Sequence, residues 1–421
     1  MATMKLLIAT AAFCLCSVAE FALADTPVTS LADGRTGRIT FSVAAGSSTL
    51  GSLVNRTYVV SDTISGDLLM PEGVTGAVPA MVISHGSGGL AVLSYAWAEM
   101  FARMGVAAFV IDHFNGRGFS STYSDQSLIN SNVIAADGLM ALRLLATHPR
   151  IDASRVGYIG FSKGGYGALL SGYERMRAAI IPDTTRFALH LPFYPGGKAT
   201  ANSLTGAPIR IYMGDLDDID TVESTRAMVD QLRVAGGDVE LTVYPGAYHA
   251  FDAAYAPTWV ANMQTNKNCP TSTNIDTFIT IDPITGSLIT DVNAYISACR
   301  TLGVHLGNNE SARSQSRQSV WSFVRQHFRL TGIPETVTLP GDTERILDWA
   351  EFRYRSLLGD RTPMQQALGY TYRCYAPSGS CAGTKDGTAY YYDGAKVLAV
   401  ENVMDVGSVS SFLTSAIADG M

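Results

Sequence analysis

The feature that most constrains the fold is an alternation of strand-like and helix-like stretches between residues 80 and 244. Short apolar runs predict strands over 80–84, 106–112, 155–161, 178–182, 208–214 and 239–244, and longer periodic stretches predict helices over 96–104, 132–148, 164–175 and 222–235. Strands joined through helices by short connections pair in parallel with right-handed crossovers. The sequence therefore predicts an α/β fold with a mainly parallel sheet flanked by helices.

Other segments extend this predicted domain on both sides, to residues 25–331. Short β-like runs at 38–42, 57–61 and 67–70 precede the alternation. Residues 253–315 are rich in Asn, Thr, Ser and Asp and interrupt it, which indicates an insertion. An amphipathic helix is then predicted over 317–330, with its apolar residues on one face.

The C-terminal part of the chain differs in character from the rest. Residues 332–340 contain two prolines and are interpreted as a linker. Residues 341–421 hold seven of the nineteen tyrosines, begin with a helical pattern and continue with short strand-like runs. We interpret 341–421 as a separate small α+β module.

The first 24 residues have the features of a signal peptide. A single Lys5 precedes an apolar stretch at 6–19, and Ala22-Leu23-Ala24 supplies the small residues that signal peptidase requires. The apolar stretch is short for a membrane span, although a retained anchor is the alternative. No later stretch is long and apolar enough to cross a bilayer. The sequence thus predicts a secreted or periplasmic protein with no membrane span after cleavage.

Charge and cysteine content narrow the possible partners. The chain of 421 residues has 30 basic and 37 acidic side chains, and a net charge of −7 disfavours nucleic acid as a partner. Four cysteines follow the predicted cleavage site, and an even number in an exported chain indicates disulfides. They allow three pairings, of which the local one joins Cys269 to Cys299 and Cys374 to Cys381. A zinc site is the weaker alternative, because no CxxC pair occurs and no histidine lies at ligand spacing.

One motif carries the strongest chemical signal. Gly160-Phe161-Ser162-Lys163-Gly164 matches G-x-S-x-G and lies between a predicted strand and a predicted helix. Such a turn exposes the serine hydroxyl, and the following helix N-terminus favours developing negative charge. This context predicts Ser162 as a nucleophile.

A serine nucleophile needs a base and an acid that orients the base. His249 follows the last predicted strand in a glycine-containing loop, and Asp217 follows the strand before it. The chain order Ser162, Asp217, His249 suits a hydrolase in which the three side chains meet at the strand ends. Asp218 is the alternative acid, whereas Asp215 and Asp220 are expected to be solvated or to cap the next helix.

The turn after the strand 80–84 has two interpretations. His85-Gly86-Ser87-Gly88-Gly89 is predicted to form an oxyanion loop, in which backbone N–H groups of Gly86 and Ser87 act together with that of Lys163. Gly86, Gly88 and Ala91 also fit a dinucleotide-binding fingerprint, and Asp112, at the end of the next predicted strand, is near the position expected for the acid that binds the ribose. That alternative leaves Ser162 and His249 unexplained.

Four further residues have both a functional and a structural interpretation. Trp97 and Tyr194 are candidates for the wall of a substrate pocket, although packing in the core explains them equally well. Arg117 is a candidate for binding a carboxylate, but we expect it to hold its own loop. His190 lies among apolar residues and is expected to be structural. No metal site is predicted.

Together these motifs resemble the dienelactone hydrolase branch of the α/β-hydrolase superfamily, in its secreted bacterial form. The matching segments are 85–89, 112–118, 160–165, 214–218 and 248–251, within roughly residues 55 to 330. The nucleophile in that family is often cysteine, whereas this chain has Ser162. The region after residue 341 resembles a short module appended to some exported bacterial proteins.

The motifs and the resemblance imply an exported serine esterase that works through an acyl-enzyme without a metal or organic cofactor. The implied substrates are small-molecule or polymeric esters. A peptidase or acyltransferase with the same triad, a catalytically silent binding protein and a nucleotide-dependent oxidoreductase are the alternatives.

Overall fold

The structure is a computed structural model. It describes residues 26–336, except 72, 91, 124, 254 and 255, together with five strands between residues 364 and 400. The predicted signal peptide and the helical pattern expected at the start of the C-terminal module lie outside the described residues.

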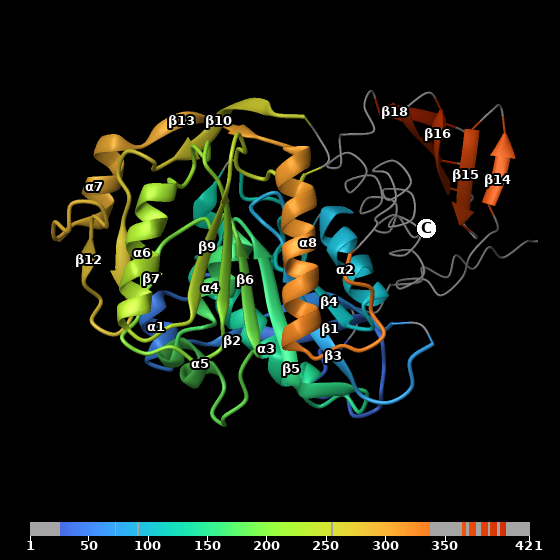
Figure 1. Cartoon of the computed structure of the whole chain (residues 1–421), viewed down its shortest axis with the longest axis horizontal. Helices are drawn as coiled ribbons and strands as arrows, with labels where there is room; N and C mark the ends of the chain where they lie inside the picture. The colour runs from blue at the N-terminus through green and yellow to red at the C-terminus, as the bar shows by residue number, and fades with distance from the viewer. Residues whose placement is uncertain are drawn as a thin grey trace, which may run out of the picture.

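An eight-stranded sheet forms the centre of the fold (Figure 1). Its strand order is β1-β2-β4-β3-β5-β6-β8-β9. The strands from β4 to β9 in this order pair in parallel, and β1 and β2 form an antiparallel edge. This arrangement confirms the α/β fold with a mainly parallel sheet that the alternation predicted. The strands are β1 Gly37–Ala44, β2 Val60–Leu69, β3 Val78–Ser84, β4 Ala107–Asp112, β5 Ile151–Phe161, β6 Leu189–Phe193, β8 Ile209–Gly214 and β9 Val239–Tyr244.

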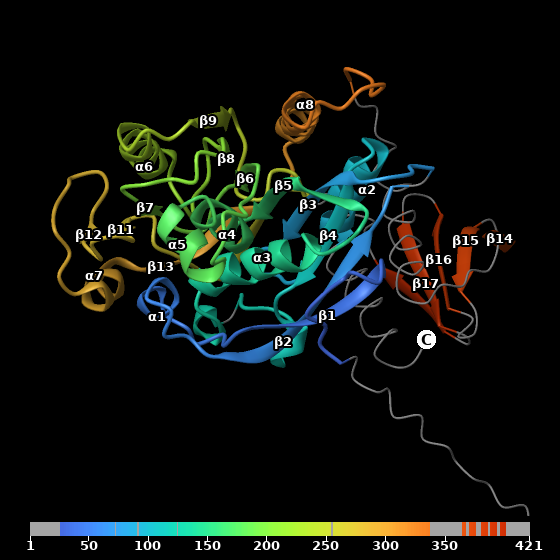
Figure 2. The same ribbon diagram turned by 90° about the horizontal axis from the view of Figure 1, so that it is seen from below.

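Helices cover both faces of the sheet (Figure 2). Apolar side chains of α1, α3, α4, α5 and α6 pack into one buried cluster, and those of α2 and α8 pack into a second cluster on the other face. Strands β3 and β4 are buried along their whole length, and their sequences are accordingly almost entirely apolar. The helices are α1 Leu50–Val54, α2 Val92–Arg103, α3 Asn132–Leu145, α4 Lys163–Leu170, α5 Glu174–Ile180, α6 Val222–Val234 and α8 Glu310–His327, with 3₁₀ turns at Asn115–Arg117 and Gln126–Leu128.

Two sequence predictions about the sheet are wrong in detail. Residues 178–182, predicted as a strand, instead hold the end of α5, and the strand that follows is β6. The apolar run at 178–182 is so short that its sequence fits the end of a buried helix as well as a strand. The separate runs predicted at 57–61 and 67–70 belong to the single strand β2.

The polar segment after residue 253 forms short elements that lie outside the eight-stranded sheet. It contains β10 Thr258–Thr265, β11 Ser272–Asn274, β12 Thr280–Ile281, α7 Val292–Cys299 and β13 Thr301–Leu306. Strands β10 and β13 pair with each other, and β11 pairs in parallel with the short strand β7 Ala199–Thr200. Helix α8 begins at Glu310, capped by the side chain of Asn309, so the predicted boundary at 315 is wrong.

The described strands of the C-terminal region form a five-stranded antiparallel sheet. They follow one another in chain order and are β14 Met364–Ala367, β15 Tyr370–Tyr375, β16 Ser380–Lys385, β17 Thr388–Asp393 and β18 Lys396–Val400. Their backbone register places Cys374 opposite Cys381. The disulfide between these two cysteines stays a prediction.

Candidate active site

Ser162 lies in a sharp turn between β5 and α4. Its backbone has φ 52° and ψ −114°, a conformation that is strained for a residue with a side chain. The turn is tight: a Cβ atom on Gly160 would lie 2.1 Å from the carbonyl oxygen of Gly164. The backbone N–H of Ser162 donates to the carbonyl of Phe193 at 3.0 Å, which ties the turn to β6. The predicted strand–turn–helix context of the G-x-S-x-G motif is therefore confirmed.

The structure brings Ser162, His249 and Asp217 into one hydrogen-bonded chain. Nε2 of His249 lies 2.9 Å from Oγ of Ser162, and Nδ1 of His249 lies 2.8 Å from Oδ2 of Asp217. The three residues follow β5, β9 and β8, at the carboxyl edge of the parallel strands. The side chains of His249 and Asp217 are almost fully buried, at 3% and 0% exposure. This arrangement is able to remove a proton from the serine hydroxyl.

The insertion helps to hold the loop that carries His249. The carbonyl of His249 accepts a hydrogen bond from the N–H of Gly307, directly after β13. Ala250, the next residue in the loop, has φ 57°. The position of the imidazole therefore depends on a segment far along the chain.

Charges near His249 favour its protonated form. Burial alone lowers the pKa of His249, but the charge of Asp217 and its hydrogen bond, with smaller contributions from Asp220 and Asp218, raise the pKa above its ordinary value. The electrostatic environment thus stabilises the imidazolium that would form when the serine loses its proton.

Asp217 and Asp218 have different partners. Besides His249, Asp217 accepts hydrogen bonds from the backbone N–H groups of Ile219 and Asp220 at 3.0 and 3.1 Å. Asp218 instead accepts from the backbone N–H of His305 and lies 2.9 Å from Nδ1 of the same residue. Only Asp217, of the two, contacts His249 through a side-chain hydrogen bond.

The predicted oxyanion loop lies against the serine turn. A Cβ atom on Gly86 would lie 3.2 Å from Cβ of Ser162, a tight contact that the glycine avoids as the loop approaches the serine turn. The carbonyl of Ser87 accepts a hydrogen bond from the N–H of Thr122 at 2.8 Å, which anchors the loop. Lys163 follows Ser162 as the first residue of α4. The oxyanion role of Gly86, Ser87 and Lys163 stays a prediction.

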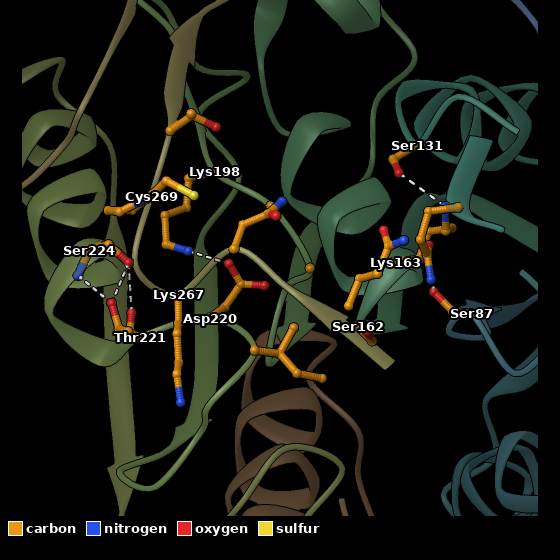
Figure 3. Close-up of a pocket in the computed structure, with 18 of the residues that line it drawn as sticks. Ser87, Ser131, Ser162, Lys163, Lys198, Asp220, Thr221, Ser224, Lys267 and Cys269 are labelled. Atoms are coloured by element: carbon orange, nitrogen blue, oxygen red, sulfur yellow. Dashed lines mark hydrogen bonds and ion pairs between the residues drawn. The ribbon is translucent and has the colours of Figure 1, made fainter. Parts of the chain in front are cut away.

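Two cavities meet at Ser162, and both are lined in part by Ser87 and Met263. The first, here called the apolar cavity, is lined by the loop 85–89 and by mostly apolar side chains, including Leu93, Tyr123, Phe161, Tyr194, Ala250, Ala253 and Leu306. The second, here called the lysine cavity, is lined by Lys163, Lys198 and Lys267 together with Gln126, Ser131, Asp220, Thr221, Ser224, Asn266 and Cys269 (Figure 3).

The two predicted pocket residues have different positions. Tyr194 lines the apolar cavity, and its ring centroid lies 4.6 Å from that of His249. Trp97 is 1% exposed and packs in the core, where its indole N–H donates to Asp252 at 3.0 Å. Tyr194 also donates its hydroxyl to Asp252, a fully buried residue that sequence reasoning missed. Its short loop of mixed polar and apolar residues gave no sign that this carboxylate is buried against Trp97 and Tyr194.

A second, buried Ser–His–Asp chain begins at Ser84, directly before the loop 85–89. Ser84 Oγ is 2.8 Å from Nε2 of His113, and Nδ1 of His113 is 2.8 Å from Oδ2 of Asp137. Arg117 donates two hydrogen bonds to the Asp137 carboxylate, at 2.8 and 2.9 Å, and another to Asp62. Arg117 thus holds its own loop, as expected, and sequence reasoning missed the chain that it completes.

Several remaining candidates have structural positions. Asp112, the ribose-binding residue of the dinucleotide alternative, is 2% exposed and accepts hydrogen bonds from the Phe114 and Asn115 backbones. His190 is fully buried and lies 3.1 Å from the hydroxyl of Ser171, and burial lowers its pKa to about 4. Among the described residues there is no group of three or more His, Cys, Asp or Glu side chains suited to a metal ion.

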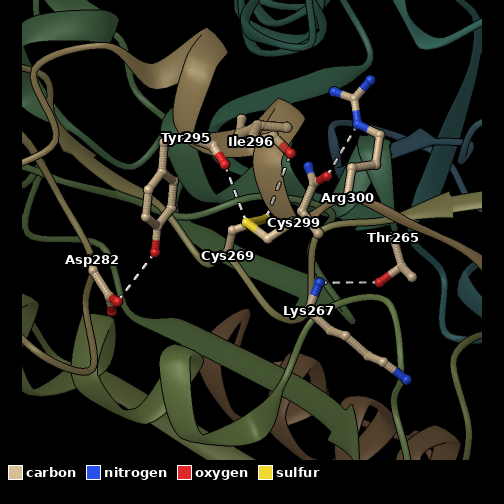
Figure 4. Close-up of a disulfide and its surroundings, with 9 residues drawn as sticks. Thr265, Lys267, Cys269, Asp282, Tyr295, Ile296, Cys299 and Arg300 are labelled. Atoms are coloured by element: carbon tan, nitrogen blue, oxygen red, sulfur yellow. Dashed lines mark hydrogen bonds between the residues drawn. A yellow bond between two sulfur atoms is a disulfide. The ribbon is translucent and has the colours of Figure 1, made fainter.

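A disulfide joins Cys269 to Cys299, with a Cα–Cα distance of 5.8 Å (Figure 4). This confirms the first of the two local pairings predicted from the sequence. Cys269 itself lines the lysine cavity, and Cys299 is the last residue of α7. The bridge therefore ties the cavity wall to the helix of the insertion. Within the part of the chain that the structure describes, no helix is long and apolar enough to cross a membrane.

The fold and the hydrogen-bonded serine at the strand ends define the chain as an α/β-hydrolase. Residues 64–277, just over half of the 421 residues, match the sequence profile of the dienelactone hydrolase family. The protein belongs to the dienelactone hydrolase family.

The individual relatives have low sequence identity to this chain. A Yersinia pestis protein, named provisionally as a carboxymethylenebutenolidase, is 26% identical over 215 residues, which cover 48% of this chain and 78% of the relative. A propionate-bound thermophilic esterase from Thermogutta terrifontis is 18% identical with a TM-score of 0.36, over 45% of this chain and 80% of its own. A dienelactone hydrolase-like promiscuous phosphotriesterase from metagenomic libraries is 16% identical with a TM-score of 0.42, over 69% and 98%.

Proposed function

We propose that the protein is an exported serine hydrolase that cleaves carboxylic esters. The observation that carries this proposal is the continuous hydrogen-bonded chain from Ser162 through His249 to Asp217, with Ser162 open to two cavities. Membership of the dienelactone hydrolase family supports hydrolysis as the class of reaction.

In the proposed mechanism, Ser162 Oγ attacks the ester carbonyl while Nε2 of His249 takes the hydroxyl proton. Asp217 holds the imidazole in the tautomer that presents Nε2 as acceptor, and stabilises its cation. His249 then gives the proton to the departing alcohol, which leaves an acyl group on Ser162. Water, activated by His249, resolves this acyl-enzyme and restores the free serine.

The negative charge of the tetrahedral intermediate needs donors near the carbonyl oxygen. We assign this role to backbone N–H groups of Gly86, Ser87 and Lys163. The close approach of the Gly86 loop to Ser162 and the position of Lys163 at the start of α4 support the assignment. The N-terminus of α4 adds a favourable dipole at the same place.

Export is part of the same proposal. The apolar segment with small residues before Asp25 and the disulfide between Cys269 and Cys299 support it, because disulfides persist in oxidising compartments. N-terminal sequencing of the protein recovered from a host periplasm or medium would locate the cleavage site, which we expect after Ala24.

The test of the enzymatic proposal is active-site labelling combined with turnover. A fluorophosphonate probe should label Ser162, located by peptide mapping, and short-chain aryl esters should be hydrolysed with release of the free acid. Absence of both results would favour a catalytically silent binding protein. Cleavage of amides with comparable efficiency, or transfer of the acyl group to an added alcohol in place of water, would favour the peptidase or acyltransferase alternative.

A further inference from the structure

Three residues in the described part of the chain line both cavities: Ser162, Ser87 and Met263. The two serines belong to the turns that meet at the site, whereas Met263 lies on β10, in the polar segment after residue 253. Met263 thus supplies the apolar side chain at the place where the cavities meet. A side chain there faces both substituents of an ester whose carbonyl lies at Ser162.

Strands β10 and β13 pair with a bulge between them. The register of the pair shifts between Val260 and Gln264. Residues 261–263 of β10 consequently lie opposite the single residue Gly303 of β13. Gly303 has φ 96°, and a Cβ atom there would lie 2.0 Å from Cζ2 of Trp259. The indole of Trp259 therefore occupies the space that a side chain at position 303 would need.

The bulge changes which residues of β10 face the interior. In a regular strand, Val260 and Gln264 would point to the same face, because alternate residues share a face. Val260 packs against the buried cluster around Met263, but Gln264 is exposed, and after the bulge Met263 and Thr265 are the buried residues. Bulges beside active sites re-aim side chains in this way. The bulge therefore turns Met263 toward the site.

The apolar contacts of Met263 extend from one cavity to the other. Met263 packs with Val304 and Leu306 of β13, and Ile219, in the loop after β8, packs against the same cluster. Leu306 lines the apolar cavity, and Ile219 lines the lysine cavity. These side chains form a partition between the two cavities, with Met263 at its centre.

The strands that carry the partition are tied to the two loops that hold His249 and its acid. The hydroxyl of Thr265, two residues after Met263, donates to the carbonyl of Asp218 at 2.7 Å. The N–H of Gly307, directly after β13, donates to the carbonyl of His249 at 3.0 Å. The backbone around Met263 is therefore fixed relative to the proposed triad.

A branched group beside the ester carbonyl would meet this partition. The carbonyl lies at Ser162, where the cavities join, and a packed wall does not yield to extra methyl groups without cost. Building on the proposed esterase function, we propose that Met263 is a specificity-determining residue, which separates the acyl group from the alcohol group and excludes acyl groups branched beside the carbonyl. The preferred substrates are then esters of unbranched acids.

The experiment compares two isomeric esters that share a leaving group. 4-Nitrophenyl pentanoate has a linear acyl group, and 4-nitrophenyl pivalate carries three methyl groups on the carbon beside the carbonyl. The readout is the ratio of kcat/KM for the branched ester to that for the linear ester. Comparing this ratio between the original protein and its variants cancels the intrinsic reactivity of the esters. Circular dichroism verifies that each variant is folded.

We expect Met263→Ala to raise this ratio at least about tenfold, the scale on which a hydrophobic pocket distinguishes one methylene group. Met263→Leu should keep the ratio within about threefold, because it preserves the volume of the side chain. Val304→Ala is the matched control and should leave the ratio unchanged. Val304 is buried in the same cluster but lines neither cavity, so its truncation loosens the cluster without opening the partition.

The kinetic result distinguishes this inference from the proposed function. If Met263→Ala leaves the ratio unchanged while both esters are hydrolysed, the inference is overturned and the esterase function stands. An equal rise in Val304→Ala or in Met263→Leu would also overturn it, because the bulk of Met263 would then not be the cause.

Equilibrium binding decides the inference without turnover. The 4-nitroanilides of pentanoic and pivalic acid have the shapes of the two esters, and Ser162→Ala removes the proposed nucleophile. By calorimetry, Ser162→Ala should bind the pentanoyl anilide about tenfold more tightly than the pivaloyl anilide, and adding Met263→Ala should remove this preference. Equal affinities for the two anilides, or no detectable binding of either, would overturn the inference.

Discussion

The molecule contains two Ser–His–Asp hydrogen-bonded chains with nearly the same distances. Ser162, His249 and Asp217 form one at 2.9 and 2.8 Å, and Ser84, His113 and Asp137 form the other at 2.8 and 2.8 Å. Both run from a serine near the end of a strand through a histidine to a buried carboxylate. Distances alone therefore do not separate a proposed catalytic chain from a structural one.

What differs is the surroundings of each serine. Ser162 lines two cavities and has a strained backbone conformation, whereas Ser84 is fully buried and its hydroxyl also lies 2.8 Å from that of Tyr158. Asp137 is held by the guanidinium of Arg117, and Asp217 by backbone N–H groups. If Ser162 is the nucleophile, as proposed, then access for substrate and nearby donors for the oxyanion distinguish it from Ser84, because the hydrogen-bonded chains behind the two serines are alike.

The largest expected effect comes from removing each serine in turn. Ser162→Ala should lower kcat for ester hydrolysis by roughly 10⁴- to 10⁶-fold, because the proposed covalent step is lost. Ser84→Ala should keep most of the activity, since no substrate reaches it. Steady-state kinetics of both purified variants, with circular dichroism to verify folding, tests the contrast. Activity that survives Ser162→Ala at the original level would end the proposed mechanism.

The next effect concerns the acids. Asp217→Asn should lower kcat by about 10³- to 10⁴-fold, because the imidazole loses its orienting carboxylate and the charge that stabilises its cation. Asp218→Asn should cost far less, since Asp218 bonds to His305. A reversed ranking of the two kcat values would assign the role to Asp218, the alternative that the sequence left open.

Asp137→Asn should affect stability in place of chemistry. Arg117 is 3% exposed at its side chain, and removing the buried carboxylate that it pairs with leaves the partly exposed Asp62 as its remaining carboxylate partner among the described residues. Breaking such a pair costs about 3–5 kcal/mol of unfolding free energy, whereas kcat of the folded variant should stay within about tenfold. Urea unfolding monitored by fluorescence gives the first number. Loss of activity without loss of stability would mean that the buried chain contributes to chemistry.

A smaller effect is expected in the pH profile. His249 must be neutral to accept the serine proton, so kcat/KM should fall as the pH drops through its pKa. The surrounding carboxylates raise this pKa above 6.5, which places the acid limb above that pH. Asp220→Asn removes part of this charge and should move the limb to lower pH. An acid limb at or below 6.5 in the original protein would contradict this electrostatic picture.

Much of the fold was predictable because the spacing of apolar residues in each segment matches the strand or helix that the segment forms. Strand β9 and helix α6 match their predicted ranges to within a residue, since the period of each is clear and α6 is capped by the side chain of Thr221. Strand β6 was missed because two of its five residues are His190 and Pro192, so its sequence does not show a continuous apolar run. The first turns of α8 were missed because residues 310–315 are almost entirely polar.

The site was predictable where it depends on loops after strands. Ser162, Asp217 and His249 each follow a strand that the sequence marks, so their meeting at one edge follows from parallel pairing. The lysine cavity was not predictable, because Lys163, Lys198 and Lys267 come from three segments that are far apart in the sequence, and Lys267 belongs to the polar segment after residue 253. The choice between Asp217 and Asp218 likewise depends on the position of His305, on β13.

The smallest expected effect concerns the disulfide in the wall of the lysine cavity, which Ser162 lines and Ser84 does not. Cys269 and Cys299 are 30 residues apart in the sequence, and a bridge of this span stabilises the folded state by about 3–4 kcal/mol in the chain-entropy view. Because Cys269 lines the lysine cavity, loss of the bridge should loosen that wall before it affects the central sheet. We expect the Cys269→Ser/Cys299→Ser variant to raise KM about two- to fivefold for esters that reach this cavity, with kcat nearly unchanged, since a looser wall binds substrate less well without moving His249. Treatment of this double variant with reductant is the control, and it should cause no further change in KM. Kinetics that match the original protein would mean that the bridge tethers the insertion without shaping the site.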